Sequence, residues 1–216
     1  MDLLKITNLT KSFGNKTILK NLNLTIKKGE IMGIFGKSGV GKTTLLRIIN
    51  MLEEYEKGKI HFQGQNIKTR KLELQRKMAM VFQTPMLFNE SVLSNVIFGL
   101  RVRGIDRTSA KKRAEKMLTQ LGIKEFDKNA SELSGGEAQR VVLIQAIIIY
   151  SDLLLLDEPS ANLDEKNVKL LEKIILDLKK QQNTTVLIAS HDAKHIKNIC
   201  NKVFCLKNGK LSQVKT

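Results

Sequence analysis

Two kinds of hydrophobic pattern alternate along the chain. Polar and apolar residues alternate at 3–9 and 22–26, which predicts two antiparallel strands with one buried face. Continuous apolar runs predict strands buried on both faces, the type found in parallel sheets. These runs occupy residues 30–35, 78–83, 153–157 and 184–190. Turn glycines delimit one more strand, at 57–65, and the chain closes with a hairpin around "KNG".

Helical periodicity fills most of the intervals between these strands. It predicts a helix at 42–52, one from Gly136 to Tyr150, one at 165–182 and a short one after residue 190. Residues 84–130 are also helical in pattern, with Thr108 as a candidate N-cap and Gly122 as a candidate C-terminal stop. The alternation predicts an α/β fold with a mainly parallel sheet, an antiparallel β-subdomain at the N-terminus and an inserted α-helical subdomain.

Composition excludes several classes of protein. Of 216 residues, 42% are hydrophobic and 27% charged, as in a soluble globular protein. The longest apolar run, at 141–149, is about half of the ~20 residues of a membrane span, and the N-terminus lacks the pattern of a signal peptide. The two cysteines have no second pair to complete a zinc site. The net charge of +16 is compatible with a phosphate-rich partner or simply with solvated lysines spread along the chain.

The stretch "GKSGVGKT" at 36–43 fits the phosphate-binding pattern G-x-x-x-x-G-K-[ST] and lies between a predicted strand and a predicted helix. In such a loop, glycines let the backbone N–H groups wrap around phosphates. Lys42 is expected to reach the outer phosphates of a nucleotide, and Thr43 to hold magnesium. The stretch therefore predicts a P-loop NTPase core.

Two carboxylates follow the apolar run in "LLLLDEP". They stand at the carboxyl end of a predicted parallel strand, where ligand sites of such sheets lie. We expect Asp157 to orient magnesium and Glu158 to polarise the water that attacks the terminal phosphate. The alternative for Glu158 is a capping or solvated acid without a chemical role.

"LSGGEAQR" at 133–140 opens a predicted helix with two adjacent glycines, although glycine costs about 1 kcal/mol relative to Ala inside a helix. With the phosphate loop, "LLLLDEP", "MVFQ" and "LIASHD" in the same order, it resembles the signature of the ATP-binding cassette (ABC) family over nearly the whole chain. A helix that starts with bare glycines offers its N–H groups to an anion. In the family, that anion is the γ-phosphate of ATP held by a second subunit.

The resemblance assigns further roles, each with an alternative. Gln83 corresponds to a residue that contacts magnesium or the lytic water, the alternative being a polar strand end. His191 corresponds to the switch histidine, the alternative being a structural histidine, and Asp164 lies in "SANLD", which is similar to the D-loop, where it also suits a helix N-cap. Phe13 stands where the family usually has a tyrosine that stacks on adenine, with a core phenylalanine as the alternative.

Together the motif and the resemblance give four groups of site residues. The catalytic group is Lys42, Gln83, Glu158 and His191; the metal group is Thr43, Gln83 and Asp157. The nucleotide-binding group is Phe13, Gly36, Lys37, Ser38, Gly39, Val40, Gly41, Lys42, Thr43 and Thr44. The group that acts on a partner's ATP is Leu133, Ser134, Gly135, Gly136 and Glu137, with Asp164 at the subunit seam.

The resemblance also implies a machine larger than this chain. It implies one ABC domain over 1–216, with a catalytic core and β-subdomain at 1–83 and 151–216 and a helical subdomain with the signature helix at about 84–150. Its cofactors are ATP and Mg²⁺, and its assembly is a head-to-tail homodimer around two ATP molecules. The implied partners are integral membrane permease subunits and an extracytoplasmic substrate-binding protein, with no nucleic acid, and the implied location is the cytoplasmic face of the cell membrane.

Two alternatives to an importer-like transport ATPase remain open from the residues. One is a soluble cassette ATPase that acts on nucleic acid or ribosomes; the compact single cassette without heptads favours the transporter. The other is a nucleotide sensor that does not hydrolyse ATP, which Glu158 disfavours. Cargo cues conflict, because different stretches are similar to importers of polar amino acids, importers of oxyanions such as tungstate or phosphate, and lipoprotein or macrolide exporters.

Overall fold

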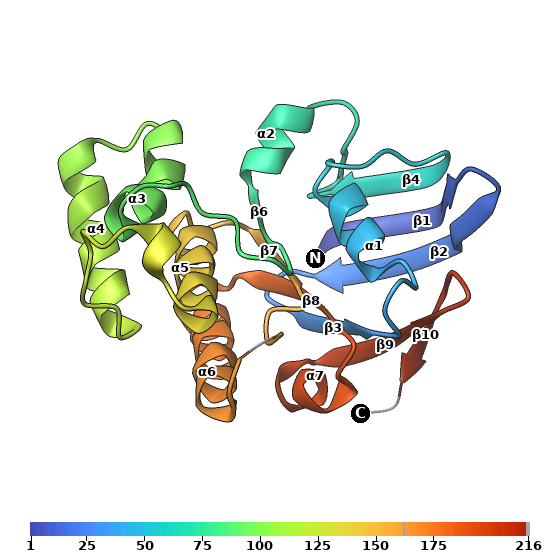
Figure 1. Ribbon diagram of the computed structural model, residues 1–216. Coiled ribbons are helices and arrows are strands. Elements are labelled where there is room, and N and C mark those ends of the chain that lie inside the picture. The colour runs from blue at the N-terminus through green and yellow to red at the C-terminus, as the bar shows by residue number, and fades with distance from the viewer. Residues whose placement is uncertain (162, 215–216) are drawn as a thin grey trace.

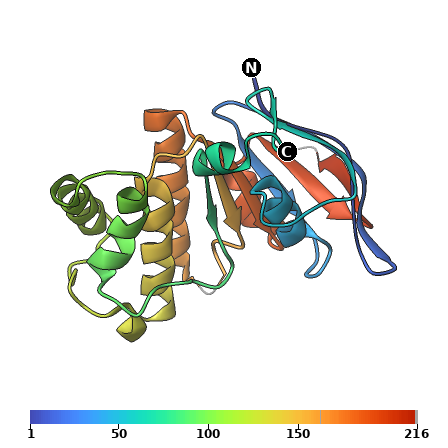
Figure 2. The same cartoon turned by 90° about the horizontal axis from the view of Figure 1, so that it is seen from above.

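The structure is a computed structural model of the chain, and it describes residues 1–161 and 163–214. Asn162, within the "SANLD" stretch, lies outside the described residues. Helices α3, α4 and α5 stand at one end of the molecule and the antiparallel strands β1, β2 and β4 at the other, with a second sheet between them (Figures 1 and 2).

The central sheet has six strands in the order β10-β9-β3-β8-β7-β6. All neighbours pair in parallel except the β9–β10 hairpin. The strands are β3 (Ile31–Phe35), β6 (Met78–Val81), β7 (Leu153–Asp157), β8 (Thr185–Ser190), β9 (Lys202–Lys207) and β10 (Lys210–Val214). The mainly parallel sheet that the apolar runs predict is therefore confirmed.

Successive residues of β7 enter two different cores. Leu153 and Leu155 pack with α1 (Lys42–Ile49) and the antiparallel sheet, whereas Leu154 and Leu156 pack with α5 (Gly135–Ile148) and α6 (Glu165–Gln182). Side chains of a strand point alternately to opposite faces, so a strand with both faces buried needs an unbroken apolar run. The carboxyl end of β7 is therefore fixed by packing on both faces of the sheet.

The antiparallel sheet has the strand order β2-β1-β4-β5. Its strands are β1 (Asp2–Phe13), β2 (Lys16–Lys27), β4 (Lys57–Phe62) and β5 (Gln65–Asn66). The two sheets meet where the backbone N–H of Lys20 donates to the carbonyl of Gly209 at 2.8 Å. The edge strand β2 therefore lies against the hairpin that ends the central sheet.

Three helices form a core of their own: α3 (Val92–Val102), α4 (Arg107–Gln120) and α5. The small residues Ala110 and Ala114 let α4 approach its neighbours closely, and both are fully buried. The group is joined to the rest of the molecule by α5, whose opposite side packs on the central sheet. Helix α5 is thus the connection between the two parts.

The predicted boundaries are partly wrong. Asp106, not Thr108, caps α4, because its carboxylate accepts from Ser109 N–H at 2.9 Å; Gly122 follows the helix in the left-handed conformation, as a C-terminal stop does. The helix predicted at 42–52 ends at Ile49, and the strand predicted at 78–83 ends at Val81. The short helix α2 (Lys71–Arg76) and the 3₁₀ turn at Ala130–Glu132 were not predicted.

Three further predictions of elements need correction. The strand predicted at 57–65 is divided into β4 and β5, the helix predicted from Gly136 to Tyr150 is Gly135–Ile148, and the helical pattern at 84–130 forms helix only in α3, α4 and the 3₁₀ turn. Helix α6 has the predicted bounds, a short helix α7 (Ala193–Ile199) follows β8, and the final hairpin turns at residues 208 and 209. Within the described ranges 1–161 and 163–214, no helix is long and apolar enough to cross a membrane. Cys200 and Cys205 are free thiols.

Candidate functional site

The phosphate-binding pattern forms the turn between β3 and α1, the predicted place. Lys42, the first residue of α1, is only 6% exposed, and its Nζ lies 2.8 Å from the carbonyl oxygen of Gly36 and 3.3 Å from that of Lys37. Gly41 precedes the helix without a side-chain cap, so the first N–H groups of α1 are offered to a ligand. The loop is thus arranged to surround an anion.

Two glycines of this loop are required by the chain itself. Gly41 has φ 110°, and a Cβ there would lie 2.6 Å from Cγ2 of Ile18. A Cβ at Gly36 would lie 2.6 Å from the carbonyl oxygen of Leu206. Larger residues would displace β2 or β9, so these glycines fix the loop against both sheets.

Glu158 is bound by two different parts of the chain. Its Oε1 lies 3.2 Å from Nζ of Lys42, and its Oε2 accepts from the backbone N–H of His191 at 3.1 Å and lies 2.8 Å from His191 Nδ1. The contact arises because β7 and β8 are parallel neighbours. Glu158 and His191 are each the first residue after the carboxyl end of one of these strands, so they lie next to each other. Its backbone has φ 48°, an unusual conformation for a non-glycine residue.

Burial and hydrogen bonding shift the pKa of Glu158 in opposite directions. Burial alone would raise the pKa of its carboxyl, but the hydrogen bonds from His191 and the contact with Lys42 outweigh it and leave the pKa below its ordinary value. The carboxylate is therefore ionised at neutral pH. The alternative of a solvated acid is wrong, because only 5% of Glu158 is exposed.

The pKa of Asp157 is shifted in the opposite direction to that of Glu158. It is 1% exposed, and burial raises the pKa of its carboxyl above the ordinary value, although a hydrogen bond from the Thr43 side chain acts to lower it. Its Oδ1 is buried without a hydrogen-bond partner. A buried carboxylate oxygen without a partner is costly unless a cation or donor reaches it, so this oxygen fits a magnesium ligand.

An open depression of about 430 Å³ brings the three predicted magnesium residues together. Thr43 comes from the start of α1, Asp157 from the end of β7, and Gln83 from the segment after β6. The polar hydroxyl, amide and carboxylate oxygens are ligands that Mg²⁺ accepts. Arg47 also lines the depression and was not predicted; its place one helical turn after Thr43 is the signal that could have found it.

The signature stretch lies at the tip of α5. Ser134 is the N-cap, and it forms a capping box with Glu137: the Ser134 Oγ accepts from Glu137 N–H at 3.4 Å, and Glu137 Oε2 accepts from Ser134 N–H at 2.9 Å. A Cβ added at Gly135 or Gly136 would meet nothing within 4 Å. Nothing in the described chain therefore explains why these two positions are glycine.

Phe13 ends β1 with 49% of its surface exposed, so the alternative of a core phenylalanine is wrong. Nζ of Lys11 lies 4.6 Å from the centroid of its ring. Lys11 is nearly buried and paired with Glu53 at 2.9 Å, and this ion pair raises its pKa. Sequence reasoning missed Lys11, which lies on the same face of the strand two residues before Phe13.

Asp164 caps α6, since its Oδ1 accepts from Asn167 N–H at 2.8 Å. The N-cap part of its dual prediction is therefore confirmed. Asn167 also accepts at 2.7 Å from Nη1 of Arg140, which belongs to the signature helix α5. The start of α6 is thus bound to the helix that carries the signature stretch.

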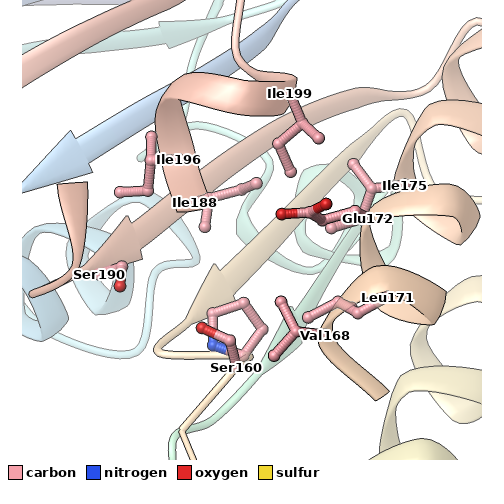
Figure 3. Close-up of a pocket in the computed structure, with 10 residues that line it drawn as sticks. Ser160, Val168, Leu171, Glu172, Ile175, Ile188, Ser190, Ile196 and Ile199 are labelled. Carbon is pink, nitrogen blue, oxygen red and sulfur yellow. The ribbon is translucent and has the colours of Figure 1, made fainter. Parts of the chain in front are cut away.

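A second, much smaller cavity lies behind the carboxyl ends of β7 and β8 (Figure 3). Its volume is about 20 Å³, and isoleucine, leucine and valine side chains of α6, α7 and β8 line most of it. Figure 3 shows Ile188, Ile196 and Ile199 facing Val168 and Leu171 across it. It has room for little more than a water molecule, so it is a packing gap and no substrate site.

The parallel sheet, the phosphate loop and the carboxylates at the end of β7 define a nucleotide-binding cassette. The family model described as ABC transporter matches residues 19–161, and the chain belongs to this family. It is an ATP-binding, ATP-hydrolysing subunit of such a transporter, with ATP and Mg²⁺ as its ligands.

Among the relatives, the chain is 36% identical over 209 residues to the tungstate uptake system ATP-binding protein TupC of Peptoclostridium acidaminophilum, covering 96% of each chain. It is 35% identical to the Fe(3+) ions import ATP-binding protein FbpC of Escherichia coli O157:H7, covering 99% of this chain but 62% of that protein. These names support the transporter over the soluble-ATPase alternative.

Two solved structures have the same fold. The ATP-binding cassette MJ0796, a dimer in a post-hydrolysis state bound to ADP and Pi, has a TM-score of 0.90 and 28% identity, with 98% of each chain covered. The cbiO1 protein from Clostridium perfringens, part of the ABC transporter complex cbiONQ, has a TM-score of 0.87 and 32% identity, covering 98% of this chain and 87% of that one.

Proposed function

We propose that Glu158 is the general base of ATP hydrolysis and that this chain acts as one half of a head-to-tail homodimer. The observation that carries the proposal is the place of Glu158, which is buried and ionised between Lys42 and His191 beside the unpartnered oxygen of Asp157. In this assignment a water attacks the terminal phosphorus of ATP, its proton passes to Glu158, and the bond to the leaving ADP oxygen breaks.

The neighbouring residues have separate roles in this proposal. The phosphate loop from Gly36 to Thr44 surrounds the phosphates, and Lys42 stabilises the charge on the outer ones. Thr43, Gln83 and Asp157 would hold magnesium, which supplies charge neutralisation at the phosphates when bound. His191 orients Glu158 through the bond at its Nδ1 and contacts the γ-phosphate.

The second half of each site comes from the partner in this proposal. Leu133 to Glu137 complete the pocket around the ATP held by the other subunit, and Asp164 lies at the seam. The open space at Gly135 and Gly136 supports this arrangement, because an anion can approach bare N–H groups there. The adenine stacks on Phe13, whose exposed ring is already placed by Lys11.

We propose a membrane partner on the surface next to Gln83. The side chains of Met86, Phe88 and Phe98 are all at least half exposed there, and the rings of Phe88 and Phe98 lie 4.9 Å apart between centroids. Adjacent exposed apolar residues are typical of protein-binding surfaces. The permease subunits would bind this surface, which places the chain at the cytoplasmic face of the membrane.

We also propose that the transporter is an importer. Relatives named for tungstate uptake, Fe(3+) import, sulfate/thiosulfate import and methionine import support this direction. An extracytoplasmic substrate-binding protein would then deliver the cargo. In the same proposal the chain is one domain, with residues 1–83 and 151–216 as the catalytic core and β-subdomain and about 84–150 as the helical part that moves with the permease.

The experiment that tests the base is the substitution Glu158→Gln. Because the amide cannot accept the proton, ATP turnover should fall on the order of a thousandfold while nucleotide binding is kept, and the ATP-bound protein should elute as a dimer on a sizing column. Glu30→Gln is the matched control: Glu30 is another nearly buried glutamate, ion-paired with Lys202 at 2.8 Å at the far end of β3. A fully active Glu158→Gln variant would remove Glu158 from the role of base.

A further inference from the structure

Asn95, in the first turns of α3, is a buried polar residue with an unusual set of bonds. It is 1% exposed, its Oδ1 accepts from Phe88 N–H at 2.8 Å, and its Nδ2 lies 3.1 Å from the carbonyl oxygen of Phe88. Nδ2 is also 3.3 Å from the carbonyl of Glu90 and 3.0 Å from that of Ser91. One side chain thus takes both backbone groups of Phe88, as a neighbouring strand would do.

The segment that Asn95 holds is irregular. The structure describes all of residues 82–90, and none of them is in a helix or strand. This segment starts beside Gln83 in the depression with Thr43 and Asp157 and ends at α3. A loop without its own hydrogen-bond ladder takes its position from such side-chain contacts. Asn95 therefore fixes the end of the Gln83 loop against α3, together with the Ala130 N–H, which donates to the carbonyl of Glu90 at 2.9 Å.

A second bond connects Asn95 to the signature helix. The amide Nε2 of Gln145, in α5, donates to the backbone carbonyl of Asn95 at 3.0 Å. The same two helices share an apolar core in which Val92 and Val96 pack with Ile144. Helix α5 begins with Gly135, so the loop at one end and the signature tip at the other are attached to one packed pair of helices.

We propose that Asn95 is a positioning residue that binds the Gln83 loop to the signature helix, with Gln145 as its contact on α5. When Gln83 moves with the nucleotide, Asn95 transmits the movement to Ser134, Gly135 and Gly136. Packed helices move as rigid units, whereas a loop released from its side-chain contacts absorbs the movement itself. This inference rests on the proposed function, because it requires that Gln83 and the signature tip both serve hydrolysis.

The test is Asn95→Ala in the purified full chain. Asn95 has no contact with the phosphate loop, so the Kd for a fluorescent ATP analogue should stay within about twofold of wild type. The kcat for ATP should fall about 10- to 100-fold, the loss expected when a catalytic segment is displaced by about 1 Å. Hydrogen exchange at the Phe88 amide should become faster, because that N–H loses its acceptor.

Two further variants separate positioning from general loss of stability. Asp106→Ala removes the cap of α4 in the same helical group without touching residues 88–91, so it should lower the melting temperature and leave kcat unchanged. Gln145→Leu removes only the bond on the α5 side and should lower kcat in the same direction. Because both residues serve one connection, the double variant should lose less kcat than the product of the two single losses.

Each outcome decides the inference. If Asn95→Ala keeps the wild-type kcat while the Phe88 amide exchanges freely, Asn95 has no positioning role. If Asn95→Ala does not fold, Gln145→Leu decides, and an unchanged kcat in that variant overturns the inference. The proposed function has a separate outcome: it fails if wild-type turnover does not depend on Glu158, whereas a Glu158-dependent enzyme that ignores Asn95 and Gln145 overturns only this inference.

Discussion

The two glycine-rich helix starts of this protein differ in what surrounds them. At the phosphate loop, Gly36 and Gly41 are required by neighbouring strands, and Lys42 is bound to two loop carbonyls and to Glu158. At the tip of α5, Gly135 and Gly136 face open space. One start is explained by the chain's own packing, whereas nothing in the described residues explains the other.

This difference gives a general criterion for incomplete sites. Gly135 and Gly136 occupy the first two positions of α5 without an internal steric reason in the described chain, and two bare positions at a helix start support an external contact. Here the external contact fits an anion, because the N–H groups at the start of a helix are unpaired and carry partial positive charge. The comparison thus supports a two-chain site from the structure of one chain.

Among the tests of this comparison, the largest expected effect comes from filling the open space at the tip of α5. In Ser134→Arg, the long side chain occupies the space in front of α5, so ATP hydrolysis should fall about 100-fold or more while the monomer still binds ATP. Hydrolysis rate and equilibrium binding of a fluorescent ATP analogue are the measurements. Ser134→Ala separates bulk from the lost side chain: it also loses the capping box, worth about 1 kcal/mol, but adds no bulk, so it should lose less hydrolysis than Ser134→Arg. Unchanged hydrolysis in Ser134→Arg would separate the signature from the active site.

A pair of glycine substitutions makes the same comparison with the smallest possible change. Gly135→Ala should leave the melting temperature unchanged or higher, because its methyl group meets nothing within 4 Å, and yet reduce hydrolysis. Gly41→Ala should lower the melting temperature, since φ is 110° and Ile18 is 2.6 Å from the new Cβ. If Gly135→Ala destabilised the free monomer as much as Gly41→Ala, the contrast between the two starts would be lost.

A smaller effect, on stability, tests the buried Asp157 beside the phosphate loop. Burial raises the pKa of Asp157, so its charge costs stability at neutral pH, and Asp157→Asn should raise the unfolding free energy in urea by about 1 kcal/mol without magnesium. This gain should shrink as the pH falls through the raised pKa of Asp157 towards the ordinary value of 3.8, since the wild-type carboxyl then becomes neutral as well.

Binding of Mg-ATP should reverse which of the two proteins, wild type or Asp157→Asn, is the more stable. With saturating Mg-ATP the wild type should become the more stable, because only it gains the full binding free energy through Asp157. Urea midpoints with and without Mg-ATP are the measurement. An Asp157→Asn variant that is less stable under every condition would show that Asp157 is a structural residue.

The last test concerns the edge of the site, where nucleotide binding and not the chemical step is expected to change. Phe13→Ala removes the exposed ring beside Lys11, so the KM for ATP should rise about tenfold with kcat nearly unchanged, the loss expected for one stacked base. Phe13→Tyr keeps the ring face and should behave like wild type. A fall in kcat at unchanged KM would assign Phe13 to the chemical step and not to nucleotide binding.

The sequence predicts those parts of the molecule that depend on short-range pattern. The apolar runs place the parallel strands, and Asp164 marks the start of α6, because burial on both faces and N-capping are local requirements. The order Gly-Lys-Thr and the acids after β7 likewise locate the phosphate loop and carboxylates. The bonds among them were not predictable, since strand order brings His191 to Glu158.

The missed features depend on long-range contacts. Asn95 is an ordinary polar residue in a helical pattern, and only the folded chain shows that its amide binds Phe88 and that its carbonyl meets Gln145, 50 residues later. The wrong N-cap of α4 has a different cause: Thr108 and Asp106 are both good capping residues, and the pattern does not show that the helix already begins at Arg107.

The contact between β2 and the final hairpin affects how the protein behaves among many copies of itself. A free strand edge is a template for pairing with any other extended chain, which leads to aggregation. Here the backbone of Lys20 is already bonded to Gly209, and the exposed lysines at 16, 20 and 27 line β2 with positive charge. In the proposed function, a subunit pairs with a second copy through the tip of α5, and the covered edge of β2 disfavours a different pairing, strand against strand, between the same two chains.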